Sequence, residues 1–137
     1  MGANFMGNFF IAVDGDNVGQ KLDYYTFINS VDELRSFSQN FLEKMNWLQD
    51  ELKDKLEAEI IFCGGDNLMV RLPPSVTSRD LLKNMLTKIF MDFENVGNTL
   101  SAGIGNSPRD SAIALKFAKS SGKNCIKFYG DFTNAEE

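Results

Sequence analysis

Two short apolar runs separated by a glycine-rich turn constrain the fold of this chain more than any other feature. Residues 59–63 and 68–72 each have the length of a strand, and the sequence Gly-Gly-Asp-Asn at residues 64–67 joins them. This pattern predicts an antiparallel β-hairpin. The turn also carries a carboxylate, Asp66. Whether this acid has a structural or a catalytic role must be judged from the rest of the sequence.

Strand and helix patterns surround the hairpin in a regular order. Residues 8–13 have the pattern of a buried strand that ends at Asp14, and residues 99–105 and 124–129 predict two later strands. Apolar residues that recur at steps of three and four predict amphipathic helices between them. The residues that signal the helix starts are Ser30, Ser78 and Ser107.

The resulting order is β-α-β-β-α-β-α-β, whose first six elements match the ferredoxin-like, or split βαβ, arrangement. We therefore expect an α+β fold with an antiparallel-centred sheet and with the helices packed on one face. The length of 137 residues suits one domain. We expect that domain to fill residues 1–137, with a core over about residues 8–130 and frayed termini.

This arrangement brings two acids together. The first and third strands are antiparallel neighbours, so Asp14 at the end of one lies beside Asp66 at the start of the other. Two adjacent carboxylates repel each other, and a divalent cation would neutralise them. Oxygen ligands of this kind suit Mg²⁺ or Mn²⁺. The sequence therefore predicts Asp14 and Asp66 as metal-binding, catalytic residues.

The composition removes several classes of chemistry and of partner. The chain has no histidine, so histidine-based catalysis and histidine-ligated zinc are excluded. The net charge of −5 argues against binding to extended nucleic acid. No apolar run reaches membrane-spanning length and no signal peptide is visible. The two cysteines lie far apart without metal-ligand spacing, which favours a reducing, cytoplasmic location.

Lysines and glycines supply further candidate positions. Lys116, Lys119 and Lys123 share one helical face, which is either a solvated face near a helix C-terminus or a cationic clamp for a triphosphate. Glycines near the two acids would let a ligand approach the backbone. They are Gly15, Gly19, Gly64 and Gly65.

Four segments together resemble the nucleotide-cyclase palm superfamily. They are "FFIAVDGDNVG" (9–19), "FCGGDNLMV" (62–70), "SAGIG" (101–105) and "ALKFAKSSGKNCIKF" (114–128). The last resembles the closing signature of GGDEF diguanylate cyclases, and the first two resemble the palm domains of type III CRISPR polymerase subunits. In size and pattern, the chain is most similar to the minimal CRISPR polymerase family, mCpol.

The resemblance implies a role for each matching position. Asp14 and Asp66 would be the metal carboxylates, and the Gly15 carbonyl would be a backbone metal ligand. A ribose hydroxyl would attack an α-phosphate, with pyrophosphate leaving and two metal ions assisting. A glycine-containing loop is expected after Asp14, and residues 16–19 of it would lie along the triphosphate. The positions implied to contact the nucleotide are Gly15, Asp16, Asn17, Val18, Gly19, Gly64, Gly65, Asn67, Lys119 and Lys123.

Some positions depart from the family patterns. Asn67 stands where GGDEF domains have Glu and CRISPR polymerases usually have Asp, and Gly19 replaces a lysine of the first GGDEF motif. Leu22 falls where guanine-reading GGDEF domains carry Asn, which favours ATP over GTP. One palm holds one nucleotide in these families, so a cyclic dinucleotide implies a homodimer.

Three functions follow as hypotheses. The first is an enzyme that makes a cyclic di- or oligonucleotide from NTP, with ATP favoured, as a second messenger in antiviral defence that a downstream effector would sense. The second is a degenerate palm that binds nucleotide as a sensor, for which Asn67 is the reason. The third is a dimerisation module without nucleotide chemistry.

Overall fold

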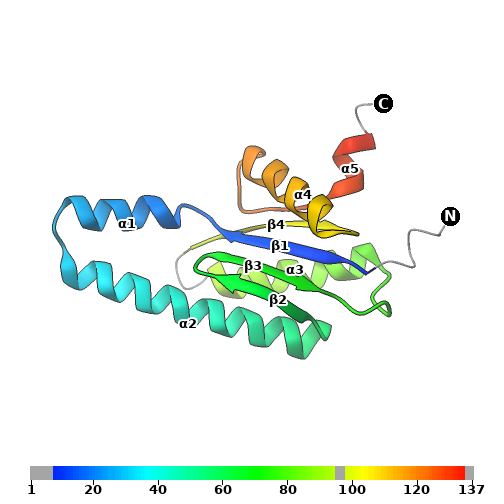
Figure 1. Ribbon diagram of the computed structural model, residues 1–137, viewed down its shortest axis with the longest axis horizontal. Coiled ribbons are helices and arrows are strands. Elements are labelled where there is room, and N and C mark those ends of the chain that lie inside the picture. The colour runs from blue at the N-terminus through cyan, green and yellow to red at the C-terminus, as the bar shows by residue number, and fades with distance from the viewer. Residues whose placement is uncertain (1–7, 95–97, 135–137) are drawn as a thin grey trace.

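The computed structural model describes residues 8–94 and 98–134, which form one mixed sheet with helices on it (Figure 1). The strands are β1 (Phe10–Gly15), β2 (Glu59–Gly64), β3 (Asn67–Arg71), β4 (Leu100–Gly105) and β5 (Ile126–Phe128). The helices are α1 (Val18–Phe27), α2 (Val31–Leu56), α3 (Arg79–Glu94), α4 (Pro108–Ser120) and α5 (Tyr129–Asn134). None of the described helices is long and apolar enough to cross a bilayer.

The sheet has the strand order β2-β3-β1-β4-β5, in which all neighbours are antiparallel except β4 and β5. The predicted hairpin is the β2–β3 pair, and β1 lies between β3 and β4, as the ferredoxin-like order requires. The α+β class and the central antiparallel strands are thus confirmed.

The core lies between the sheet and helices α2 and α3. Residues at steps of three and four on α2 are buried, including Phe41, Met45, Leu48 and Leu52. They meet alternate residues of the strands, such as Ile11, in one apolar cluster. The period-3.6 face of the helix and the period-2 face of the sheet therefore bury each other.

Helix α4 covers the opposite face of the sheet, so the prediction that the helices share one face is wrong. Gly103 of β4 lies between Ala102 and Ile104 of the apolar cluster, and side chains alternate along a strand. A Cβ atom on Gly103 would lie 2.1 Å from the backbone nitrogen of Leu115 in α4. The helix reaches this side because glycine and small residues such as Ala114 let it approach closely.

Two helices replace segments that were predicted as irregular. Helix α1 occupies much of the expected loop after Asp14, and α5 occupies part of the expected frayed tail. In Figure 1, α1 and the first part of α2 project beyond the end of the sheet. Tyr24, Phe27 and Ile28 of this projection are exposed, so α1 lacks the apolar stripe that would have revealed it.

Candidate active site

The two predicted acids meet at the end of the sheet from which α1 projects. Asp14 of β1 pairs in register with Asn67, the residue after Asp66. The backbone amide of Gly15 donates a hydrogen bond of 3.0 Å to the carbonyl oxygen of Asp66. The carboxyl group of Asp66 is close enough to that of Asp14 to contribute to the raised pKa of Asp14. The antiparallel neighbours predicted from the element order are therefore present.

Asp14 has one partnered and one unpartnered carboxylate oxygen. Its Oδ2 lies 3.1 Å from the ammonium of Lys119. Within the described part of the chain, its Oδ1 is buried and has no hydrogen-bond partner. Burial raises the pKa of Asp14 above its ordinary value, and Asp66 adds to the effect while Lys119 opposes it. A buried, unsatisfied carboxylate oxygen is costly unless a further group completes it.

Asp16 is placed differently from the expectation that it lies along a triphosphate. Its side chain is only 1% exposed, and protein groups surround it. Oδ1 accepts from Ser101 Oγ at 2.8 Å and from Lys119 Nζ at 2.8 Å. Oδ2 accepts from Thr99 Oγ1 at 2.6 Å and from the backbone amide of Asn124 at 2.9 Å. This carboxylate therefore joins β1, β4 and the entry to β5.

The ionisation of Asp16 follows from these contacts. Burial alone would raise its pKa, but the hydrogen bonds from Lys119, Thr99, Ser101 and the Asn124 amide outweigh burial and lower the pKa. Asp16 is thus an anion at neutral pH. Both of its carboxylate oxygens accept hydrogen bonds from protein groups that surround the end of β1.

Lys119 lies between the acids instead of at an open phosphate position. Besides the contacts to Asp14 and Asp16, its ammonium donates to the Gly15 carbonyl oxygen at 3.0 Å. Burial favours loss of its charge, but the hydrogen bonds to Asp16 and Asp14 prevail and raise the pKa of Lys119. It is therefore a fixed positive charge at the end of β1.

The segment that was predicted to line a triphosphate forms the start of α1. Asn17 is the N-cap residue and has a left-handed φ of 62°. Its side-chain oxygen accepts from Lys123 Nζ at 2.7 Å, so the second predicted phosphate-binding lysine lies at the same place. Val18 and Gly19 open the helix, where backbone amides have no helical acceptor. Helix N-termini with these free amides favour anions.

The glycines of the site serve different purposes. Gly65 has a φ of 65° in the hairpin turn, and Cβ atoms on Gly64, Gly65 or Gly19 would meet nothing within 4 Å. These three positions are therefore open to a ligand. A Cβ on Gly15 would instead lie 2.8 Å from the Val18 side chain and 2.9 Å from the Phe41 ring, so Gly15 is required by packing.

An apolar pocket adjoins the hairpin turn. Its volume is about 310 Å³, and it lies between α1, α2 and the turn. The residues that line it are Val18, Gly19, Leu22, Phe37, Ser38, Phe41, Leu42, Gly65 and Asp66. Its walls are mainly aliphatic and aromatic, which suits a flat ring such as a nucleobase.

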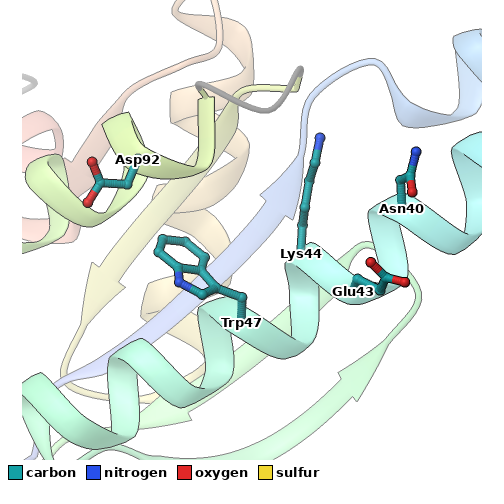
Figure 2. A pocket seen from close by; sticks show the side chains of 5 residues that line it. All are labelled: Asn40, Glu43, Lys44, Trp47 and Asp92. Carbon is teal, nitrogen blue, oxygen red and sulfur yellow. The ribbon is translucent and has the colours of Figure 1, made fainter.

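A second hollow lies elsewhere, between α2 and α3. Figure 2 shows Lys44 and Trp47 on α2 with Asp92 on α3, and Asn40 and Glu43 complete its lining. Trp47 packs against Phe93 with ring centroids 6.4 Å apart, so this side chain lies at the margin of the core. The hollow shares no lining residue with the Asp14–Asp66 site.

The residues at the sheet end fit a divalent cation. The Asp14 and Asp66 carboxylates supply hard oxygen ligands of the kind that Mg²⁺ and Mn²⁺ take, whereas the nearby Gly15 carbonyl accepts a hydrogen bond from Lys119. The unpartnered Asp14 Oδ1 is the observation that favours such an ion. Among the described residues, no larger cluster of three or more histidine, cysteine or acidic side chains is suited to a metal.

The supporting residues Thr99, Ser101 and Asn124 were not predicted as part of the site. Ser101 is completely buried in β4, where every other neighbour is apolar or glycine. A hydroxyl in a fully buried strand needs a partner, and that signal was present in "TLSAGIG". Lys116, the third member of the predicted lysine face, is exposed and lies outside the cluster of contacts at Asp16.

Residues 10–129 match the family model of the minimal CRISPR polymerase domain, mCpol. The chain belongs to this family. The match covers all five strands and helices α1 to α4, including every residue of the site described above. No curated protein matches the chain.

Solved structures share the fold of this mCpol domain. The GGDEF domain of DgcB from Caulobacter crescentus, in complex with c-di-GMP, superposes with a TM-score of 0.70 at 14% identity, covering 91% of this chain and 80% of that one. The active GGEEF domain of a diguanylate cyclase from Vibrio cholerae has a TM-score of 0.62 at 18% identity, covering 90% and 83%.

A CRISPR protein contains the same fold as part of a larger chain. The structure of a Csm1–Csm4 cassette in complex with cA4 has a TM-score of 0.68 at 16% identity, covering 88% of this chain but 20% of that one. The mCpol domain therefore has the fold of nucleotide cyclases and of the CRISPR polymerase palm.

Proposed function

We propose that this mCpol domain is a metal-dependent nucleotidyltransferase that joins nucleoside triphosphates, with ATP favoured, into a cyclic di- or oligonucleotide. The observation that carries the proposal is the pair Asp14 and Asp66 with the buried, unpartnered Asp14 Oδ1. These two acids lie side by side, and one oxygen of Asp14 has no partner in the described part of the protein. A divalent cation bound there could assist phosphate chemistry. Membership in a family of polymerase palms favours the same reaction class.

The nucleotide would lie across the end of the sheet. The apolar pocket beside Leu22 and Phe37 would take the base, and the absence of a side-chain amide or acid at Leu22 favours adenine over guanine. The triphosphate would extend towards the start of α1, where the open amides and Lys123 carry positive charge. The α-phosphate would then lie near Asp14 and Asp66.

In the reaction, a ribose hydroxyl oxygen forms a bond to the α-phosphorus. The bond from that phosphorus to the oxygen bridging to the β-phosphorus breaks, pyrophosphate leaves, and the hydroxyl proton passes to solvent. A bound Mg²⁺ or Mn²⁺ would supply Lewis-acid stabilisation of the charge on the phosphate oxygens. Asp14 and Asp66 would hold it, and Asp16 would keep Lys119 and the β1 end in place.

A cyclic dinucleotide is made from two nucleotides, whereas one apolar pocket adjoins Asp66 in the site described here. We propose that two copies of the chain meet with their sites facing each other, as the family resemblance implies. The product would act as a second messenger in antiviral defence, sensed by a downstream effector.

The test is mass spectrometry of products after incubation with MnCl₂ and all four NTPs. We expect a cyclic adenylate from the unaltered protein and a decrease of about a hundredfold or more in Asp66→Asn, because a metal ion supplies several kcal/mol to such transition states and each ~1.4 kcal/mol is tenfold in rate. Asp50→Asn, which alters an exposed acid of α2, is the matched control and should retain activity. Unchanged nucleotides with every protein would refute the proposal.

A nucleotide sensor without turnover is the second candidate, and Asn67 favours it. This residue begins β3 beside Asp66 and offers an amide where related enzymes carry an acid. In that case bound nucleotide would stabilise the folded protein by RT ln(1 + [L]/Kd) and so raise its melting temperature. The nucleotide itself would be recovered intact. Asn67→Asp would then be expected to restore turnover.

A further inference from the structure

The ammonium of Lys119 uses all of its hydrogen-bonding capacity inside the site. An ammonium group has three donors. Its three acceptors are the Gly15 carbonyl oxygen at 3.0 Å, Asp16 Oδ1 at 2.8 Å and Asp14 Oδ2 at 3.1 Å. The Gly15 carbonyl and the Asp14 carboxylate are also the oxygens that a metal ion at the end of β1 would require.

Lys119 is held there by rigid surroundings. Its side chain is 24% exposed, and Asp16, its closest partner, is 1% exposed. Asp16 is in turn fixed by Ser101, Thr99 and the Asn124 amide. Helix α4, which carries Lys119, rests directly on the backbone of Gly103. A lysine that withdrew would leave the buried Asp16 charge without its cation, which is strongly unfavourable.

The two oxygens of Asp14 therefore have separate environments. Oδ2 faces the Lys119 ammonium, whereas Oδ1 is buried without a partner and belongs to the carboxyl group that interacts with Asp66. The Lys119 ammonium thus takes the cation position beside Asp14 Oδ2. Asp14 Oδ1 and the Asp66 carboxylate are left to bind a metal ion from solution.

The charges agree with this division. The carboxylates of Asp14, Asp16 and Asp66 are balanced in part by Lys119, which leaves two negative charges at the site. One divalent cation neutralises them. Asn67 contributes no charge, so there is no further acid on the hairpin turn to hold a second ion.

We infer that Lys119 is the resident second cation of the site, and that each chain accordingly binds one divalent ion, held by Asp14 and Asp66, where the family resemblance implies two. This inference rests on the proposed nucleotide chemistry for its biological meaning. It assigns Lys119 to positioning and charge balance at Asp14 and Gly15, and leaves phosphate contact to Lys123 and the start of α1.

The experiment is a titration of Mn²⁺ followed by electron paramagnetic resonance, with the nucleotide held as unreactive α,β-methylene-ATP. We expect one bound Mn²⁺ per chain at saturation, without the spin coupling that two ions about 3.5–4 Å apart would show. Two coupled ions per chain in the unaltered protein would overturn the inference, and would leave the proposed reaction standing. No bound Mn²⁺ with nucleotide present would overturn both.

Variants of α4 make the test specific to Lys119. Lys119→Met removes the resident charge and should admit a second Mn²⁺ per chain with spin coupling, whereas Lys119→Arg should stay at one. Lys116→Met, an exposed lysine one turn earlier on the same helix, is the matched control and should also stay at one. A count of one for a folded Lys119→Met would contradict the inference, and circular dichroism establishes that the variant is folded.

Discussion

The carboxylate of Asp16 accepts hydrogen bonds from four groups, each contributed by a segment remote in sequence from β1. They are Thr99, Ser101, Lys119 and the amide of Asn124. None of these partners forms a recognisable motif with Asp16 in the chain. The acids Asp14 and Asp66 could be predicted because the element order places their strands side by side. The role of Asp16 could not, because it depends on which side chains a buried carboxylate meets after folding.

At this scale we predict that Asp16→Asn lowers the free energy of unfolding by about 3 kcal/mol, because it breaks a buried ion pair. The side-chain nitrogen of the new asparagine is also a donor, and it would face groups that donate hydrogen bonds to Asp16 in the unaltered protein. Urea unfolding measures the change. Asp50→Asn should alter stability by less than about 0.5 kcal/mol, since that acid is exposed. A small effect of Asp16→Asn would mean that its charge is not needed for the fold.

Among the elements, those with a clear period were predicted and those without one were not. Helix α2 could be predicted because its apolar residues recur at the spacing of one helix face. The β2–β3 hairpin could be predicted because two apolar runs of strand length flank a glycine-rich turn. Helix α1 has exposed aromatic residues such as Phe27 and no continuous buried stripe, so its pattern resembled a loop. The apolar face of α4 was evident, but a periodic face does not state which side of a sheet it covers.

Gly103 is the strand position at which the packing of α4 can be tested. In Gly103→Ala the new Cβ would lie 2.1 Å from Leu115 N and 2.3 Å from Ser111 O, both backbone atoms that cannot rotate away. We expect a loss of about 2 kcal/mol or more in unfolding free energy, because overpacking forces the helix to shift.

The same shift should disturb the site, because Lys119 is carried by α4. Activity and nucleotide binding are therefore expected to fall together with stability in Gly103→Ala. Gly130→Ala is the matched control, since a Cβ there would meet nothing within 4 Å. Equal stability of the two variants in urea would show that α4 tolerates a wider separation from the sheet than its contacts indicate.

At the scale of the whole molecule, the candidate site residues lie at one end. The β1 end, the hairpin turn and the start of α1 lie together there, and α1 with the first part of α2 projects past them (Figure 1). The apolar pocket is lined by this projection and by the turn. Under the proposed function, each chain would present one nucleotide position at this end.

From this arrangement we predict that formation of a cyclic product requires two chains. The initial rate should rise roughly with the square of protein concentration while the protein is mainly monomeric, and linearly once dimers are saturated. Chromatography of products over a dilution series, with sedimentation at the same concentrations, measures both. A strictly linear rate through the monomeric range would contradict the two-chain arrangement.

The partners of Asp16 lie 83, 85, 103 and 108 positions further along the chain. During translation, Asp14 and Asp16 leave the ribosome long before Lys119, the lysine that pairs with both. An incomplete chain thus carries two acids without their lysine at the end of β1, a strand that still lacks its neighbour β4. The contacts at Asp16 can form only after residue 124 has emerged, so nearly all of the described fold must be synthesised before the site is complete.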